Sequence, residues 1–514
     1  MLLNLYNNLE LFLEQPTVNF GLDSQFTFSI LITILPELIL FTGIFIIIIV
    51  LGMAYSSNTT NILVATIRLV SYSIIICSLL IIVITWLWFY LIPMNDCTIT
   101  FLEGTYSINF YTQFLKIIIT ISTLYLYKYF NLPSNKINAA ELPLLIHICT
   151  LLTFIIISCT NFAILLLSLE GFSLALYILT TIDRSRGGIT AAAKYFVFGT
   201  LGSVLMLWGV VHLYSFYYNI SYSSILTLSQ LMLVNNDIIL MQSSYNFATI
   251  SILIGLLIKL GAAPVHQWVP DVYTGVHLVI TAYFATVVKF IIFIIFCIIA
   301  YCNNYNSIIY FFAICSLLVG SLVTLRQTEI KRFLAYSSIS HVGFLLIGDL
   351  TAVYIYMLVY ICSSLLFFSV LLSLTINEKE IIYLSDLRFI KKGGLWSPFA
   401  LTISLSSMAG LPPFAGFFGK YLVWVSLIED ILLFNNLESY ILLIVSIFLT
   451  LITIYYYMRL IIYIYLPSDF EPIFAPNSQY LNIDHFQAIL VIISIFWIFL
   501  QPKILSIISY ININ

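Results

Sequence analysis

Long apolar runs, each bounded by a short polar connection, repeat along almost the whole chain. A helix that crosses the hydrocarbon part of a bilayer needs about 20 mostly apolar residues, so runs of this length are typical of membrane-spanning helices. The pattern predicts about fourteen of them. They cover residues 28–54, 62–92, 108–128, 143–160, 161–182, 190–216, 246–268, 276–302, 306–326, 332–350, 352–376, 397–428, 436–466 and 485–508.

The basic residues provide an independent test of this number. Eleven Lys and Arg residues lie in or beside connections, and all of them fall between an odd-numbered helix and the even-numbered helix that follows: Lys128, Lys136, Arg184, Arg186, Arg326, Lys331, Arg332, Lys379, Arg388, Lys391 and Lys392. The opposite connections contain acidic residues but no Lys or Arg. Under the positive-inside rule, this asymmetry favours fourteen helices with both termini on the side away from the cytoplasm or matrix.

The composition narrows the class of protein. Of the 514 residues, 62% are apolar and 8% are charged, and the mean hydropathy is +1.09. Soluble proteins carry about 25% charged residues, so these values exclude a soluble globular protein, a nucleic-acid-binding protein and a disordered chain. The eight cysteines form no Cys-x-x-Cys pair, which is typical of core- or lipid-facing residues. The first 27 residues lack a basic segment, so we expect no cleaved signal or transit peptide.

Several charged residues lie inside the predicted helices. A charge at the bilayer centre costs at least about 2.5–3.5 kcal/mol on insertion scales, so each one needs an explanation. Arg68, Lys116 and Arg459 lie near enough to predicted helix ends for their side chains to extend to the membrane surface. Glu37, which follows Pro36, fits a structural role and a functional role equally well.

Five other charged residues have apolar sequence on both sides and are the candidate functional residues. Desolvation lowers the proton affinity of a buried lysine, and a carboxylate within about 4–6 Å restores it. The protonation of such a lysine therefore depends on its neighbours, as a proton relay requires. We expect all five to face the bundle interior or a hydrated cavity: Glu170, Lys194, Lys259, Lys289 and Lys420.

Two of these lysines lie beside expected helix breaks. The Gly-Ala-Ala-Pro segment 261–264 follows Lys259, and the Gly-Leu-Pro-Pro segment 410–413 precedes Lys420. Proline removes a backbone donor and clashes with the preceding turn, so the seventh and twelfth helices should be discontinuous. Interrupted helices at membrane depth line water or lie buried in protein. Because the breaks are five helices apart, an odd number, we expect two inverted five-helix repeats, a known transporter design.

The predicted fold class is therefore an all-α polytopic membrane protein with five parts. Residues 1–27 form an N-terminal segment outside the membrane, and residues 28–142 form the first three helices. The first repeat, helices four to eight, covers 143–302, and the second, helices nine to thirteen, covers 303–466. Residues 467–514 contain the last connection and the last helix.

Two histidines extend the candidate relay. His266 follows the first break, and His341 lies in a segment that also contains Ser337, Ser338 and Ser340. Histidine titrates near neutral pH, so it can pass protons between groups of very different affinity. A single membrane histidine is more often a packing residue, but the nearby break and the hydroxyl cluster favour a relay role for these two.

Motifs for nucleotide or redox chemistry are missing. The sequence contains no Walker A motif, no Gly-x-Gly-x-x-Gly segment between a strand and a helix, no cysteine cluster for an iron–sulfur centre and no histidine pair with spacing for haem. We therefore expect no cofactor and no metal in this chain. The energy that moves charge through it has to come from a partner.

Three segments resemble signature sequences of the antiporter-like membrane subunits of respiratory complex I, the NADH–ubiquinone oxidoreductase. They are LIKLGAAPVHQWVPDVYTG, LRQTEIKRFLAYSSISHVGFLLIG and SLSSMAGLPPFAGFFGKYLVW. With Glu170, Lys194 and Lys289 at matching positions, the resemblance covers about residues 140–460. The chain departs from these relatives at 274–278, where they have an acid and a Ser-Pro-Thr-Pro run.

The resemblance implies a role for each candidate. Glu170 and Lys194 would pair between the fifth and sixth helices, Lys259 would be the central lysine, Lys289 the linking lysine and Lys420 the exit-side lysine. It also implies a large hetero-oligomer in lipid, made with other membrane-arm subunits, in which partners hold FMN, iron–sulfur clusters and quinone. The chain would then be one subunit of a proton-translocating NADH:ubiquinone reductase, without a redox centre of its own.

Other classes of protein share these features. One is a subunit of a multi-subunit cation/proton antiporter, another is a different antiporter-like subunit of complex I, and a third is a membrane scaffold whose lysines pair with acids for packing. The chain has 40 Phe and 35 Tyr but only 21 Gly and 14 Pro, a bias that AT-rich codons produce. We therefore expect the mitochondrial inner membrane, with both termini on the intermembrane-space side; a plastid or an AT-rich bacterium stays open.

Overall fold

The computed structural model describes most of the chain. It covers residues 24–56, 60–91, 98–101, 104–129, 141–182, 184–218, 220–222, 239–301, 306–374, 381–393, 395–434, 437–466 and 485–497. Almost all of the predicted N-terminal segment 1–27 lies outside these residues, as do Lys136 and Lys379.

Helices make up most of the described chain. In order they are α2 (Ser24–Ser56), α3 (Thr60–Leu91), α4 (Phe110–Tyr127), α5 (Glu141–Ser158), α6 (Phe162–Thr181), α7 (Arg186–Tyr217), α9 (Ile239–Leu260), α10 (Trp268–Gly275), α11 (Leu278–Tyr283), the π-helical turn η2 (Phe284–Val288), α12 (Lys289–Tyr301), α13 (Asn306–Thr324), α14 (Ile330–Leu345), α15 (Leu350–Ser373), the 3₁₀ helix η3 (Leu384–Gly393), α16 (Trp396–Ala409), α17 (Ala415–Phe434), α18 (Leu437–Tyr465) and α19 (His485–Ile495). Helical segments overlap all the ranges that the apolar pattern predicts. Among the described residues, nine helices are long and apolar enough by themselves to cross a membrane. The chain is therefore a helical, multi-pass membrane protein, and the number fourteen and the inverted repeats stay predictions.

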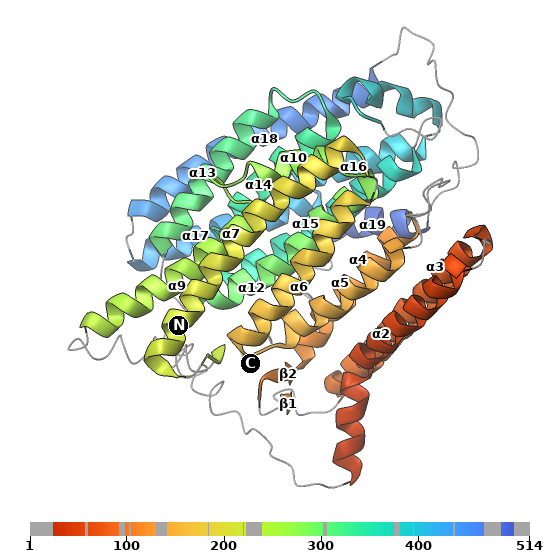
Figure 1. The fold of residues 1–514 in the computed structure, drawn as a ribbon. Coiled ribbons are helices and arrows are strands. Elements are labelled where there is room, and N and C mark those ends of the chain that lie inside the picture. Colours follow the sequence, from red (N-terminus) through yellow and green to blue (C-terminus); the bar gives the residue numbers. More distant parts are fainter. Residues whose placement is uncertain are drawn as a thin grey trace.

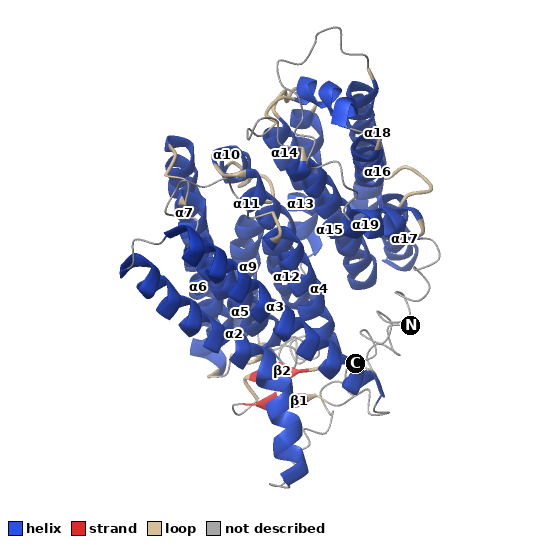
Figure 2. Ribbon diagram, turned by 90° about the vertical axis from the view of Figure 1, so that its right-hand side faces the viewer, coloured by secondary structure: helices blue, strands red, loops and turns tan. Residues whose placement is uncertain are grey.

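The helix bundle also carries one short β-hairpin, which the sequence analysis did not predict. Strand β1 (Ile99–Phe101) pairs antiparallel with β2 (Tyr106–Ile108), with Ile99 opposite Ile108. This hairpin lies at one end of the helix bundle, directly before α4 (Figure 2). Tyr106 also forms a bridge with Cys159, which holds the hairpin against the end of α5.

Both predicted helix breaks are confirmed. Helix α9 ends at Leu260 and α16 ends at Ala409, and the next helix begins several residues later in each case. Gly261 and Gly410 follow directly, with φ angles of +74° and +82°. A side chain at such an angle costs about 1–2 kcal/mol, so glycine is the residue that turns the chain here. The Trp268 indole donates to the carbonyl of Ile258 at 3.1 Å, which satisfies a backbone acceptor beside the first break.

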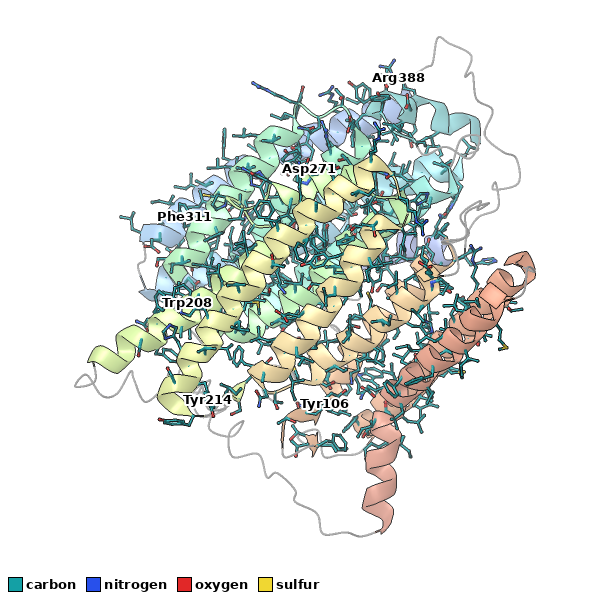
Figure 3. The ribbon with its side chains drawn as sticks, in the orientation of Figure 1. Tyr106, Trp208, Tyr214, Asp271, Phe311 and Arg388 are labelled. Carbon is teal, nitrogen blue, oxygen red and sulfur yellow. The ribbon has the colours of Figure 1, made fainter. Side chains whose placement is uncertain are left out.

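The elements that surround the centre of the bundle come from both predicted repeats. Among the described apolar spans, Leu278–Ala300 is the most enclosed: 94% of an 18-residue stretch within it is buried, and α15 packs against it. The antiparallel helices α2 and α3 lie at one edge of the bundle and pack on α4 and α5 (Figure 1). We call the end that carries β1 and β2 the hairpin end and the end that carries η3 the basic end. Tyr106 and Arg388 mark these two ends (Figure 3).

Candidate functional site

Lys289 is buried at the centre of the bundle. It begins α12 directly after the π-helical turn, and π turns inside α-helices occur frequently at functional sites. Its side chain is 6% exposed, and Nζ donates to the Ser338 hydroxyl of α14 at 2.6 Å. The ammonium also lies 5.8 Å from the centre of the Tyr273 ring. Lys289 is therefore interior, as the sequence predicts, and is held by an oxygen and an aromatic face instead of a carboxylate.

His341 lies one turn after Ser338 on α14 and is held from two sides. Its Nδ1 is 2.7 Å from the Tyr356 hydroxyl of α15, and its Nε2 is 3.0 Å from the Tyr457 hydroxyl of α18. A neutral imidazole has one donor nitrogen and one acceptor nitrogen. One tyrosine must therefore donate to the ring while the other accepts from it. The two hydrogen bonds of this group then run in the same direction, from one tyrosine through the imidazole to the other.

Lys420 is buried against the second break. Its side chain is 2% exposed, and Nζ donates to the Ala409 carbonyl at 2.8 Å and to the Thr453 hydroxyl at 3.3 Å. The Ala409 carbonyl is at the end of α16, where the helix no longer supplies an amide donor. The break thus provides the oxygen that Lys420 needs in an apolar region.

Four groups form what we call the buried relay: Lys289, Ser338, His341 and Lys420. Lys289 contacts Ser338 directly, and the charges of both lysines act on His341. The residues come from α12, α14 and α17, so the relay joins segments of the two predicted repeats. The structure therefore places Lys289, His341 and Lys420 close enough for their charges to interact, and among these groups only Lys289 and Ser338 share a hydrogen bond in the described part of the chain.

Lys259 lies in a different place, in the last turn of α9, and is 8% exposed. It lines a small cavity with room for about one water molecule, together with Ser173, Tyr177, Tyr195 and Trp268. Among the described residues, the Lys259 ammonium donates no hydrogen bond to a side chain, but the Glu170 charge acts on it. Lys259 is interior as predicted, and its acidic neighbour is Glu170.

The predicted pairing of Glu170 with Lys194 is wrong. Lys194 forms its ion pair with Asp271 of α10, at 2.5 Å between Nζ and Oδ2. The side chains of this pair are 54% and 39% exposed, and Glu170 is exposed as well. In the chain by itself, these residues lie on the outer face of α6, α7 and α10 and not in the interior. The reason is geometric: Lys194 is less than three turns from the start of α7, where α10 packs against that helix.

His266 is not part of the buried relay. Its ring is half-buried at the first break, with Nδ1 3.2 Å from the Pro264 carbonyl and the ring 6.3 Å from that of Tyr336. Within the described residues it forms no hydrogen bond with any of the lysines. A relay role for His266 stays a prediction.

Comparisons with known proteins agree with this architecture. Residues 158–453 match the family described as NADH:quinone oxidoreductase/Mrp antiporter, transmembrane. The chain belongs to this antiporter-like family.

A bacterial relative covers nearly the whole length of this chain. It is 31% identical to NADH-quinone oxidoreductase subunit N of Pelagibacter ubique, over 93% of this chain and 98% of that protein. Its fold is similar to that of a chain of respiratory complex I from Thermus thermophilus, with a TM-score of 0.73 and 23% identity over 91% and 98% of the two chains. A chain of the Mrp complex from a Dietzia species gives a TM-score of 0.73 and 16% identity over 93% and 97%. The resemblance to complex I antiporter-like subunits of the N type, also numbered subunit 2, is confirmed.

Several polar residues of this family member were missed by the sequence analysis. They are Tyr273, Tyr356, Tyr457, Thr453 and Asp271, which contact the predicted lysines and His341. Asp271 and Tyr273 lie inside a quoted signature segment, so their position near Lys259 in the sequence was an available signal. No local pattern marks Tyr356 or Tyr457, because tyrosine is common throughout the chain.

The buried relay contains hydrogen-bonding groups of the kind that proton transfer requires. Each lysine has a hydrogen-bond acceptor for its ammonium form, and His341 has a phenol at each ring nitrogen. A proton that enters at one ring nitrogen can leave at the other, because the two tautomers differ only in which nitrogen carries hydrogen. No three His, Cys, Asp or Glu side chains in the described part of the chain are grouped to hold a metal ion.

Proposed function

We propose that this chain is the N-type, or second, subunit of an NADH–ubiquinone oxidoreductase and translocates or relays protons across the membrane. The observation that carries this proposal is the buried relay, in which the charges of Lys289 and Lys420 both act on the buried His341. Within the described residues, neither lysine donates a hydrogen bond to a carboxylate. A purely structural lysine at membrane depth would be expected to pair with an acid. These two are stabilised by neutral oxygens, so their charge depends on local hydration and neighbouring charges.

The proposed sequence of proton positions begins at Glu170 and Lys259. Glu170 acts on Lys259, so a change in the charge or position of Glu170 alters the proton affinity of Lys259. A proton released from Lys259 passes through water to Lys289, then through Ser338 and His341 to Lys420. Electron transfer from NADH to quinone occurs in partner subunits and supplies the energy. In the proposed mechanism, electron transfer is coupled to proton movement through electrostatic interactions, and no covalent step occurs in this chain.

Exposed charges on α6, α7 and α10 support assembly with partner subunits. Glu170, Lys194 and Asp271 lie among exposed apolar side chains such as Leu167 and Val197. A charge that faces lipid at this depth costs at least about 2.5 kcal/mol, so a polar membrane partner covers this face in the complex. We propose that the partners are other membrane-arm subunits and that those of the redox arm hold FMN, iron–sulfur clusters and quinone.

The proposed location is the mitochondrial inner membrane, with both termini on the intermembrane-space side. The support is the excess of Phe and Tyr over Gly and Pro and the basic residues at one end. The relatives named above are bacterial, so the alternative is the inner membrane of an AT-rich bacterium. Peptide mapping of the purified membranes distinguishes the two compartments.

The test is Lys259→Ala in the assembled complex, with Lys128→Ala as the control because Lys128 is an exposed lysine at the end of α4. We expect the Lys259 variant to lose most proton translocation and coupled NADH–quinone activity, while the Lys128 variant keeps both. Proton translocation is measured in proteoliposomes with a pH-sensitive dye. Undiminished translocation in an assembled Lys259→Ala complex would refute the proposal.

A second candidate function is that of a subunit of a multi-subunit cation/proton antiporter. The structural likeness to a chain of the Mrp complex favours it. The two functions differ in their partners and in sodium dependence. Purification with iron–sulfur and flavin subunits supports the first function, whereas sodium-dependent proton exchange without such subunits supports the second.

A further inference from the structure

The small cavity beside Lys259 comes close to the outside of the chain on one side only. Ten residues of α6, α7, α9, α10 and α12 line it. Eight of them are buried, whereas Ser173 and Tyr177 of α6 are half-buried. The shortest way from Lys259 to the outside of the described chain therefore runs past these two side chains, onto the outer face of α6.

The Tyr177 phenol rests directly on the backbone of α7. A Cβ atom added to Gly199 would overlap the Tyr177 hydroxyl oxygen and would lie 3.0 Å from Cζ of the same ring. One turn further along α7, a Cβ atom added to Gly202 would lie 3.2 Å from Cγ of Lys259. Residues three positions apart are neighbours on the surface of a helix. The Tyr177 phenol and the stem of Lys259 therefore lie next to each other against α7.

Other aromatic rings hold the phenol in this position. The Tyr177 ring packs edge to face on Tyr195 and Phe196 of α7, with 4.9 and 5.4 Å between ring centres. The Tyr195 ring lies 5.0 Å from that of Trp268, whose indole donates to the carbonyl of Ile258 beside the first helix break. Edge-to-face aromatic pairs are favourable beyond the area that they bury. The position of Tyr177 is therefore coupled to that of the break.

The charged outer face of α6 lies on the other side of Tyr177. Glu170, Ser173 and Tyr177 have the spacing of residues on one face of a helix. Side chains of a helix lean toward its N-terminus, so the Tyr177 phenol points back toward the level of Glu170. The Glu170 charge acts on both Tyr177 and Lys259. Tyr177 thus lies between an exposed acid and a buried lysine.

This arrangement matters for a lysine that passes protons to the interior. Closing a reactive site prevents protons from leaking to the wrong place. Without the Tyr177 phenol, the cavity would extend between α6 and α7 to the face that carries Glu170. A proton on Lys259 could then leave toward that face and would not reach Lys289.

We propose that Tyr177 is a positioning residue that closes the Lys259 cavity toward the outer face of α6 and α7. The inference rests on the proposed function and adds a residue to it. While the phenol rests on Gly199, a proton on Lys259 passes inward to Lys289 and not outward to the Glu170 face. Tyr177 itself neither takes up nor releases a proton.

The number of protons translocated per NADH oxidised tests this proposal in proteoliposomes that contain the assembled complex. We expect Tyr177→Ala to keep oxidising NADH while this ratio falls, because protons leave Lys259 by the wrong route. Tyr177→Phe keeps the ring in place and should keep the native ratio. Tyr214→Ala is the matched control, since Tyr214 is an exposed tyrosine of α7, and it should also keep the ratio. A merely structural defect would lower both rates together and leave the ratio unchanged.

The outcomes separate this inference from the proposed function. A native ratio in an assembled Tyr177→Ala complex, together with lost translocation in Lys259→Ala, would overturn the role of Tyr177 and leave the proposed function intact. Undiminished translocation in Lys259→Ala would instead remove the proposed function itself.

A second variant keeps the test decisive if Tyr177→Ala does not assemble. Gly199→Ala adds only a methyl group, but that group takes the place of the Tyr177 hydroxyl and forces the phenol off α7. We expect the same fall in protons per NADH. Gly171→Ala of α6 is its control, because the added Cβ atom would meet the Leu152 side chain at 3.4 Å, an ordinary contact distance. Equal native ratios in both glycine variants would contradict the proposal.

Discussion

The two tyrosines that hold His341 allow a sharp test of the buried relay. Tyr356→Phe and Tyr457→Phe each remove one hydroxyl group and leave the ring that packs in the core. The change leaves one nitrogen of His341 without its partner in an enclosed region. If protons pass through the imidazole from one nitrogen to the other, either substitution interrupts the path.

The structure sets the size of the expected effect. A buried polar group that loses its partner is destabilised by about 1–3 kcal/mol. Since 1.36 kcal/mol corresponds to a factor of ten, the step through His341 should slow about 5- to 150-fold. We expect coupled proton translocation to fall within that range in each variant. The double variant should be little worse than either single one, because one interruption already blocks a linear path.

The assay measures proton uptake and NADH oxidation together in proteoliposomes that contain the assembled complex. Tyr360→Phe is the matched control: Tyr360 lies one turn after Tyr356 on α15, and its ring is 5.1 Å from that of His341, without a hydrogen bond to either nitrogen in the described structure. Wild-type translocation in both Tyr356→Phe and Tyr457→Phe would refute the transfer of protons through His341. An equal loss in Tyr360→Phe would show that packing, and not the hydroxyls, is responsible.

Three further variants test the surroundings of the relay. Ser338→Ala removes the hydroxyl that accepts from Lys289 and should slow translocation about tenfold, measured as above. Ser369→Ala is the control and should not slow it, because the buried Ser369 hydroxyl bonds only the Leu366 carbonyl among the described residues. Gly410→Ala forces a side chain into a φ of +82° and against the α17 lysine, so the melting temperature of the complex should fall, while Gly52→Ala, with open space around it, should leave it unchanged. Desolvation and two acidic residues of α17 raise the pKa of Asp349 to about 6, so the folded state favours its protonated form. Asp349→Asn should therefore stabilise the complex above about pH 6, and this gain should disappear as the pH falls toward 4, which melting curves at several pH values would reveal.

The sequence by itself determined the membrane class, the helix positions and the two breaks. These features are local: about 20 apolar residues suffice to span a bilayer, and a glycine or proline ends a helix wherever it stands. Apolar sequence on both sides correctly marked Lys259, Lys289 and Lys420 as interior. The same pattern failed for Glu170 and Lys194, which lie on the outer face of the chain.

Only the tertiary structure decided which polar groups meet. Lys194 pairs with Asp271 and not with Glu170, because α10 returns to the start of α7 after the first break, a path that the spacing along the chain does not reveal. Lys116 lies near the predicted end of a helix in the sequence, but its side chain is buried. It is covered by Glu37 of α2, Phe154 of α5 and Tyr106 of the β-hairpin. Partner choice in a bundle depends on which helix faces touch, and such contacts join residues that are tens to hundreds of positions apart.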